Sequence, residues 1–351
     1  MSRRLIPALA ILACCACPLL ADEPAVVKPV PDAHPTVKAP IHGVDPQAWV
    51  EPDCGCQKEE ACQGGGGFYA QGGVSFLRPT WETNPAFFSG TNLNAAGQPT
   101  FETDNEFDWD FEAAPHAEVG YLNANRFGGR ARYTQFDHGA GAAFTVLPGN
   151  TAGSARPLGL AIPIVNAGQT VQISSNLDFY VIDAEVMKVW QRNKWRLEGS
   201  AGVRYLDLEQ SYRFAVLNGQ TLVSRSSIEG FGPTVSFEAR RAIGCSGLSI
   251  FAGTRLSILF GDEAQDASLI GGERRITDTE SVQPIGEIEG GVNWTGEWGS
   301  AQPFIEVAGV GQVWWGAGNA SNSHLADQPA GGYDNSNMGL LGARVSAGVN
   351  Y

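Results

Sequence analysis

The side chains best suited to covalent or metal chemistry are four cysteines. Cys54, Cys56 and Cys62 lie close together, and Cys245 lies far downstream. Deprotonated thiols in such a cluster bind zinc or copper in other proteins, but no histidine lies nearer to it than His42. In an exported protein the same residues form disulfides, and four cysteines admit three pairings. We therefore expect disulfides among these four cysteines, with no metal and no other cofactor.

Histidines next to carboxylates are the candidates for acid–base catalysis. His138 follows Asp137, and His324 lies near Asp327. Catalysis needs both groups to converge on one substrate atom, whereas these residues are scattered singly among segments that we expect to be loops or loop edges. The sequence also has no GxSxG, HExxH or phosphate-binding glycine motif. We therefore expect solvated loop histidines and no enzyme.

Carboxylates and arginines recur at every second position in several segments. Asp110 and Glu112 flank Phe111, and Arg196 and Glu198 flank Leu197. Strand residues two apart point the same way, so each such segment has one charged and one apolar face. The charged set is too large for a dry core, because unpaired buried charges cost several kcal/mol each. We predict that the apolar face points outward to lipid and the charged face inward.

The elements that carry these faces are ten alternating segments, and the gaps between them are alternately long and short. They lie near residues 67–78, 106–122, 127–138, 171–190, 195–210, 228–241, 248–261, 282–294, 301–315 and 339–351. Transmembrane barrels have short periplasmic turns and longer external loops, and an even strand number leaves both chain ends on the periplasmic side. We therefore predict an all-β chain that forms a closed antiparallel transmembrane β-barrel of about ten strands.

Two loops leave the strand number open. The stretches near 140–170 and 206–228 contain further strand-like pieces, so eight or twelve strands are alternatives. Within the second stretch, residues 213–224 include Asn218-Gly219, a dipeptide typical of tight hairpins. We expect this piece to be a hairpin that extends beyond the membrane.

The first 66 residues divide into a leader and a linker. Arg3 and Arg4 precede an apolar run and small residues near Ala21, which predicts a signal peptide over 1–21. An alternative is a lipoprotein signal with Cys14 as the lipidated residue. Residues 22–66 are rich in proline, cysteine and glycine and predict a disordered periplasmic linker, which leaves 67–351 for an outer-membrane barrel. The formal charge of −14 excludes nucleic acid as a partner, since phosphate binding needs a basic surface.

Aromatic side chains cluster at the ends of the predicted strands, as in the girdles at the two membrane interfaces. Those beside the short turns are Tyr121, Phe127, Trp190, Trp195, Trp294, Trp298 and Tyr351. Those toward the long loops are Phe76, Trp81, Trp109, Tyr205, Phe260, Trp314 and Trp315. The final segment alternates up to a terminal aromatic, which is typical of a closing strand, and we expect outer-membrane lipid and the barrel-assembly machinery to be partners of the chain.

Several short motifs resemble the pore-forming family typified by the Legionella major outer membrane protein. They are Phe107-Asp108-Trp109-Asp110-Phe111-Glu112, Val119-Gly120-Tyr121, Arg132-Tyr133-Thr134-Gln135-Phe136, Ile182-Asp183-Ala184-Glu185, Gly202-Val203-Arg204-Tyr205 and Leu259-Phe260-Gly261. The resemblance covers roughly residues 67–351 and implies a pore-forming outer-membrane barrel without a catalytic site. The cysteine-containing linker is not part of this pattern.

The inward parity assigns the candidate pore-lining residues. The acidic ones are Asp108, Asp110, Glu112, Glu118, Asp183, Glu185, Glu198, Glu238, Glu287, Glu289 and Glu306, and the basic ones are Arg130, Arg132, Arg196, Arg204, Arg240, Arg255 and Arg344. Arginine pairs two-handed with carboxylates, so we expect a cross-strand salt-bridge network. Ten strands give a narrow interior. These residues predict a narrow porin-like passive diffusion pore for small solutes or ions. Its excess of about four acids predicts weak cation preference. The alternative is a structural or adhesive surface barrel with a filled lumen.

Overall fold

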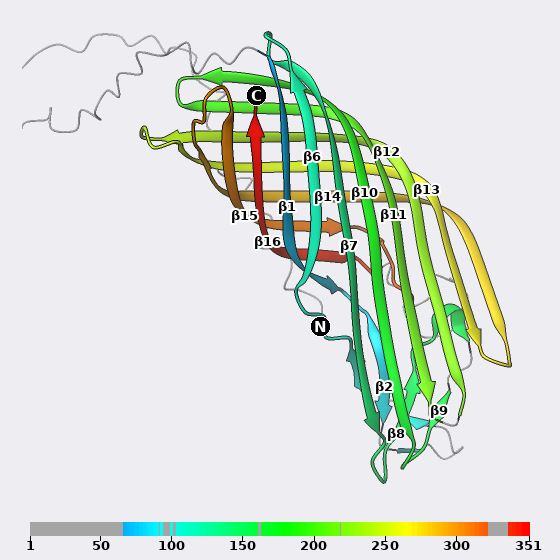
Figure 1. Ribbon diagram of the computed structural model, residues 1–351. Coiled ribbons are helices and arrows are strands. Elements are labelled where there is room, and N and C mark those ends of the chain that lie inside the picture. Colours follow the sequence, from blue (N-terminus) through cyan, green and yellow to red (C-terminus); the bar gives the residue numbers. More distant parts are fainter. Residues whose placement is uncertain are drawn as a thin grey trace, which may run out of the picture. The chain divides into compact units, whose positions relative to one another are not determined.

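A single closed barrel dominates this computed structural model, which describes residues 66–90, 92–93, 99–100, 103–160, 163–217, 219–321 and 336–351. Its strands are antiparallel neighbours in the order β1-β16-β15-β14-β13-β12-β11-β10-β7-β6 (Figure 1). Their bounds are β1 Gly67–Trp81, β6 Glu112–Leu122, β7 Phe127–Thr145, β10 Thr170–Arg192, β11 Trp195–Val216, β12 Thr221–Ile243, β13 Leu248–Leu269, β14 Arg274–Thr295, β15 Gln302–Trp314 and β16 Met338–Asn350. The predicted all-β barrel of ten strands is confirmed. The expected signal peptide over 1–21 and linker over 22–66 lie, apart from Gly66, outside the described residues.

Closure is made by the first strand of the wall, which pairs on both of its edges. Val74 of β1 lies opposite Val345 of β16 on one side and opposite Pro115 of β6 on the other. Every strand of the wall therefore has two neighbours along the part that all ten strands share. Beyond it, residues 135–145 of β7 pair only with β10, and residues 274–284 of β14 pair only with β13. A barrel in a bilayer requires two neighbours for every strand, because lipid offers no hydrogen bonds to free backbone groups. Among the described residues, no helix has the length and hydropathy of a membrane span.

The short turns gather at one end of the barrel, and each needs an unusual backbone conformation. Arg126 before β7 and Asn193 between β10 and β11 have positive φ angles of 58° and 53°. Gly244 and Gly247 do the same on either side of Cys245, with φ of 59° and 74°. Cys245, the only cysteine within the described residues, is disulfide-bonded. Cys54, Cys56 and Cys62 lie outside those residues, so the expected pairing stays a prediction, and so does the alternative of Cys14 as a lipidated residue.

The central strands are much longer than a membrane needs. Strands β10 to β14 have 22 or 23 residues each, about twice the 9–11 residues of a typical membrane strand. Over their full length they stay paired with one another, so beyond the length of a membrane strand they continue as one sheet. In the hairpin of β11 and β12, Ala215 pairs with Thr221, as predicted for residues 213–224; Asn218 lies outside the described residues.

The long connections contribute short strands of their own. β2 (Pro85–Gly90), β5 (Thr103–Glu106), β8 (Thr151–Ser154) and β9 (Ile164–Val165) form a small sheet in the order β5-β2-β8-β9, and β3 (Asn92–Leu93) pairs with β4 (Pro99–Thr100). The 3₁₀ turn η2 (Pro157–Gly159) follows β8. β2, β8 and β9 lie at the far end of the hairpins (Figure 1). The strand-like pieces near 140–170 are therefore an extension of β7 and two small strands, and they add no strand to the barrel. The alternatives of eight or twelve barrel strands are wrong.

Strands β10 and β11 reverse their polarity part of the way along. Near the short turns, Val186 of β10 is 55% exposed and Val203 of β11 is 41% exposed on the outer face. Farther from the turns, Val171 of β10 and Phe214 of β11 are fully buried on the inner face. We call the first part the membrane half and the second the projecting half. On β10 they are residues 182–192 and 170–181, and on the other strands they are the residues in register with these. The predicted arrangement, with the apolar face outward, holds in the membrane half and is wrong in the projecting half.

Candidate functional site

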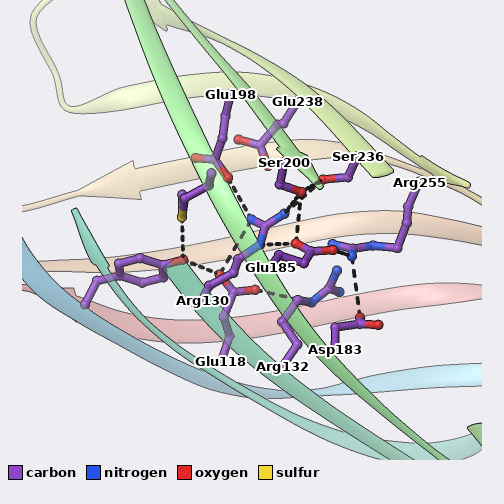
Figure 2. A network of polar contacts seen from close by, with 12 residues as sticks. Glu118, Arg130, Arg132, Asp183, Glu185, Glu198, Ser200, Ser236, Glu238 and Arg255 are labelled. Carbon is purple, nitrogen blue, oxygen red and sulfur yellow. Dashed lines mark hydrogen bonds and ion pairs between the residues drawn. The ribbon is translucent and has the colours of Figure 1, made fainter. Parts of the chain in front are cut away.

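The interior of the membrane half contains a network of charged side chains, which we call the ionic layer (Figure 2). Arg130 of β7 lies at its centre. Its Nε donates to Glu185 Oε2 at 2.5 Å and its Nη1 to Glu198 Oε1 at 2.7 Å. Its Nη2 donates to the Oγ atoms of Ser200 and Ser236 at 3.1 and 2.9 Å. One guanidinium thus joins β7, β10, β11 and β12.

A second group in the ionic layer joins β10 to strands on the far side of β11. Arg204 donates from Nε and Nη2 to the two oxygens of Asp183 at 2.6 and 3.0 Å, a two-handed pair, and also contacts Glu287. Arg255 pairs with Glu185 and lies 3.5 Å from Asp183. The side chains of Asp183, Arg204 and Arg255 are only 3–6% exposed. Their charges are therefore neutralised by one another and not by bulk water.

A third group extends the network to the strands before the C-terminus. Arg344 donates to Glu289 at 2.6 Å and to Glu306 at 2.5 Å, and Arg240 donates to Glu306 and Glu238, each at 3.0 Å. The Glu306 side chain is 4% exposed. The ionic layer therefore crosses the interior from β7 to β16.

Neutral side chains that are absent from the predicted lumen residues complete the layer. The Tyr69 hydroxyl donates to Glu118 at 2.9 Å, and His116 Nε2 lies 2.9 Å from Ser346 Oγ. The same Glu118 also pairs with the predicted lumen residue Arg132, at 3.3 Å. A signal for these groups exists in the sequence, because all occupy the inward parity of their strands.

Two of the predicted pore-lining residues do not face the interior. Asp108 is 90% exposed at the side chain and pairs with Arg78 at 3.1 Å on the outer surface, and Asp110 is exposed as well. The prediction treated residues 106–122 as one strand, whereas β6 begins at Glu112, so alternation does not apply to the residues before it. Removing both acids leaves nine carboxylates against seven arginines on the inward parity.

The remaining predicted lumen residues lie on the inward parity of their strands. Glu112 and Arg196, at the two ends, keep 46% and 43% of their side chains exposed. The others are more enclosed: Glu118, Arg130, Arg132, Asp183, Glu185, Glu198, Arg204, Glu238, Arg240, Arg255, Glu287, Glu289, Glu306 and Arg344.

An apolar cluster, which we call the aromatic layer, fills the interior next to the ionic layer on the side of the long loops. Phe136 and Phe179 stack with ring centroids 5.3 Å apart, and Trp314 lies 5.0 Å from Phe179. Trp81 and Trp109 follow at 5.1 Å from each other. Leu259, Ile285 and Met338 belong to the same cluster. The interior is thus apolar on the side of the long loops and charged on the side of the short turns.

The aromatic layer corrects the predicted outer girdle. Trp109 and Trp314 are 3% and 1% exposed, and Trp81 packs against the same cluster, so these three tryptophans do not face lipid. Phe76, Phe260 and Trp315 do face outward, at 49%, 57% and 40% exposure. The sequence carried a signal for the error: along β10 the apolar parity changes between Val181 and Ile182.

Loops close the interior beyond the aromatic layer. The Tyr212 hydroxyl donates to Ala86 O at 2.8 Å and accepts from Ala155 N at 3.1 Å, and burial raises the pKa of Tyr212, so it keeps its proton. Gln210 Oε1 accepts from Ala320 N at 3.1 Å. These bonds hold the connections after β1, β7 and β15 against the inner face of β11.

The aromatic row beside the short turns lies on the outside, at exposed positions. The exposed fractions are 43% for Tyr121, 49% for Phe127, 50% for Trp190, 44% for Trp195, 48% for Trp294, 80% for Trp298 and 74% for Tyr351. Large apolar side chains that remain exposed in a row of this kind mark a surface made for another apolar phase.

The structure separates the two members of one candidate catalytic pair, Asp137 and His138. His138 faces inward with its Nδ1 3.6 Å from Glu112, while Asp137, one residue earlier on β7, points outward. His324 and Asp327 lie outside the described residues. Within the residues that the structure describes, no group of three or more His, Cys, Asp and Glu side chains could hold a metal ion.

Comparisons with known proteins return similar barrels but no family. No family model matches the chain, and no curated protein matches it, so the resemblance noted in the sequence identifies no specific family. The Escherichia coli outer membrane protease OmpT is 8% identical, with 81% of this chain and 96% of that chain covered, at a TM-score of 0.45. A TodX mutant, a monoaromatic hydrocarbon channel, is 11% identical, with 81% and 91% covered, at 0.32. A Pseudomonas aeruginosa FadL homologue is 8% identical, with 81% and 90% covered, at 0.26.

Proposed function

We propose that this outer-membrane β-barrel is a closed surface barrel, which holds a rigid β-structure outside the membrane and has no steady aqueous pore. The observation that carries the proposal is the double filling of its interior, with the ionic layer in the membrane half and the aromatic layer next to it. This is the structural or adhesive alternative that the sequence left open.

The burial of the ionic layer supports a closed lumen. In a water-filled pore the lining charges face solvent, whereas Glu185 has 0% and Arg204 3% of its side chain exposed. Each charge has its partners among neighbouring side chains, so no water is needed to stabilise it. Opening a path would require these pairs to separate.

The projecting half supports a role at the surface. Its inner face is packed by Val171, Ile173, Phe214 and Leu222, each 0–3% exposed, against the small sheet of β2, β5, β8 and β9. Its outer face carries exposed polar groups such as Asn176 and Arg225. A filled core inside and a polar exterior are the properties of a soluble β-domain, here built on membrane strands.

A narrow diffusion pore with weak cation preference is the second candidate. The observation in its favour is the chemistry of the membrane half. The projecting half of β10 and β11 shows that this chain can pack an inner sheet face with apolar side chains, yet the membrane half keeps nine carboxylates and seven arginines on its inward parity. A polar lumen suits the passage of ions, provided that the aromatic layer and the loops move aside.

Recordings in planar bilayers separate the two candidates. We expect the reconstituted full-length chain to show no steady conductance, and liposomes that contain it to exclude small sugars in swelling assays. A stable open level in most insertions, with cations preferred over anions, would establish the pore and overturn the closed barrel. A peptide-cleavage screen on the same liposomes is expected to be negative.

A further inference from the structure

The end of the barrel that carries the short turns has a basic sector, although the whole chain has a formal charge of −14. Five basic side chains lie there at outward or turn positions of β7, β10, β11 and β12: Arg126, Lys188, Arg192, Lys194 and Arg241. In the segments 121–133, 182–205 and 231–243, every carboxylate occupies the inward parity. The turn on the other side, over 295–301, has Glu297 and no basic residue. Among the turns that the structure describes, the outward positive charge is therefore confined to one side of the rim.

The basic groups alternate with the aromatic row. Lys188 lies opposite Phe127 in register, and Trp195 has Arg192 on one side and Arg241 on the other. The Arg241 guanidinium lies 5.5 Å from the Trp195 ring centroid. Lys188 extends along the wall, so that its Nζ donates to Asn125 O in the turn at 2.7 Å. Long basic side chains with apolar stems reach the headgroup level of a bilayer in this way.

An apolar groove adjoins the basic sector on the outer face of the barrel. It has a volume of about 590 Å³ and is lined by residues of β1, β6, β7 and β16, among them Phe68, Val119, Tyr121 and Val349. Gly129 is also in the lining and has no side chain to occupy the groove. The space beside it is empty, because a Cβ at this position would meet only Glu185 O, at 3.4 Å. Tyr121 lies one short turn away from Arg126, and Gly129 lies two residues beyond Phe127.

We propose that this groove and the neighbouring basic side chains form a binding site for an anionic phospholipid of the periplasmic leaflet. One acyl chain lies in the groove, and the headgroup phosphate lies against Arg126 and Lys188. These two residues belong to one corner of the barrel, because Val189 N, next to Lys188, donates to Arg126 O at 2.9 Å. A zwitterionic lipid fills the groove equally well but carries its own ammonium group, so the basic sector selects for net negative charge.

Native mass spectrometry of the full-length protein tests the site. The protein in detergent receives equal amounts of phosphatidylglycerol and phosphatidylethanolamine with identical acyl chains. We expect phosphatidylglycerol to be retained at least several-fold more often, and this preference to disappear in the double variant Arg126→Gln, Lys188→Gln. Gly129→Leu fills the groove and should lower the retention of both lipids. Arg274→Gln, at the opposite end of the barrel, should change neither.

Two results would overturn the proposal: equal retention of the two lipids by the wild type, which indicates ordinary annular lipid, or an unchanged preference in the double variant. If the double variant does not fold, the wild type alone decides, because a phosphate contact predicts a preference that falls as salt is raised. The outcome is independent of the conductance measurement, so the lipid site and the closed barrel can fail separately.

Discussion

The two halves of the same strand place their apolar side chains on opposite faces. In the membrane half of β10, Val186 faces outward and Asp183 and Glu185 face inward; in the projecting half, Val171 faces inward and Asn176 outward. The backbone continues without a break through the change, so only the side-chain pattern differs. An apolar outer face suits lipid and a polar outer face suits water, so the side-chain pattern assigns the first half to the membrane and the second to the aqueous side.

The comparison also explains why charge is inside only one half. In the membrane half the apolar residues are needed on the outer face, so the inward positions can hold polar residues. Arginine and carboxylate side chains fill the narrow interior and form charge-assisted hydrogen bonds with one another. In the projecting half the outer face is hydrated, so the interior can be apolar like that of a soluble protein. Replacing residues in each half should therefore have different consequences.

Breaking the ionic layer should produce the largest effect. Arg204→Met leaves Asp183 and Glu287 buried without their main partner, and removing one member of a buried pair costs about 3–5 kcal/mol. Urea unfolding in lipid vesicles measures the loss. The matched control is Arg225→Met in the projecting half, where the pair with Glu209 is exposed and should contribute about 0–1 kcal/mol. Equal losses in both variants would contradict the distinction between the halves.

Placing the same charge on the outer face of each half sharpens the comparison. Val186→Lys and Asn176→Lys both alter outward positions of β10. The first puts an ammonium group into lipid and should destabilise by about 2–4 kcal/mol if Val186 lies near the middle of the bilayer. The second stays in water and should change stability by less than about 0.5 kcal/mol. The same unfolding assay reports both, and a large loss for Asn176→Lys would place the projecting half in the membrane.

Much of the membrane half could be predicted from sequence, because alternation between charge and apolar groups survives for ten residues or more in segments such as 195–205. The prediction is wrong for the projecting half, although the change of parity at Val181 and Ile182 is visible in the sequence. It is also wrong for Trp109, because this residue precedes β6, where the alternation of a strand does not apply. The pairing of Arg204 with Glu287, 83 residues away, depends on register and barrel curvature, which periodicity does not encode.

The smallest expected effect concerns like charges on the outside of the projecting half. Asp178 lies opposite Asp137 and Glu209 in register. Partial burial and the charges of Asp137, Glu209 and Asp207 raise the pKa of Asp178. A raised carboxyl pKa in the folded state means that ionised Asp178 destabilises the fold above that pKa, and this effect is lost as the pH falls through it.

Asp178→Asn should accordingly stabilise the protein at pH 7 by a few tenths of a kcal/mol. The advantage should shrink toward acidic pH, where the wild-type carboxyl is protonated. Thermal unfolding of both proteins between neutral and mildly acidic pH provides the measurement. A variant that is less stable than the wild type at pH 7 would show that the carboxylate makes a favourable contact instead.

Labelling of single cysteines along the outer face of β10 tests the reversal of polarity most directly. Cysteines are placed one at a time at the even positions from Gln172 to Trp190, and a water-soluble and a lipid-soluble maleimide compete for each in intact proteoliposomes. Positions 172–178 should react with the water-soluble reagent, and positions 182–186 with the lipid-soluble one. A single environment along the whole face, either all lipid or all water, would contradict the account.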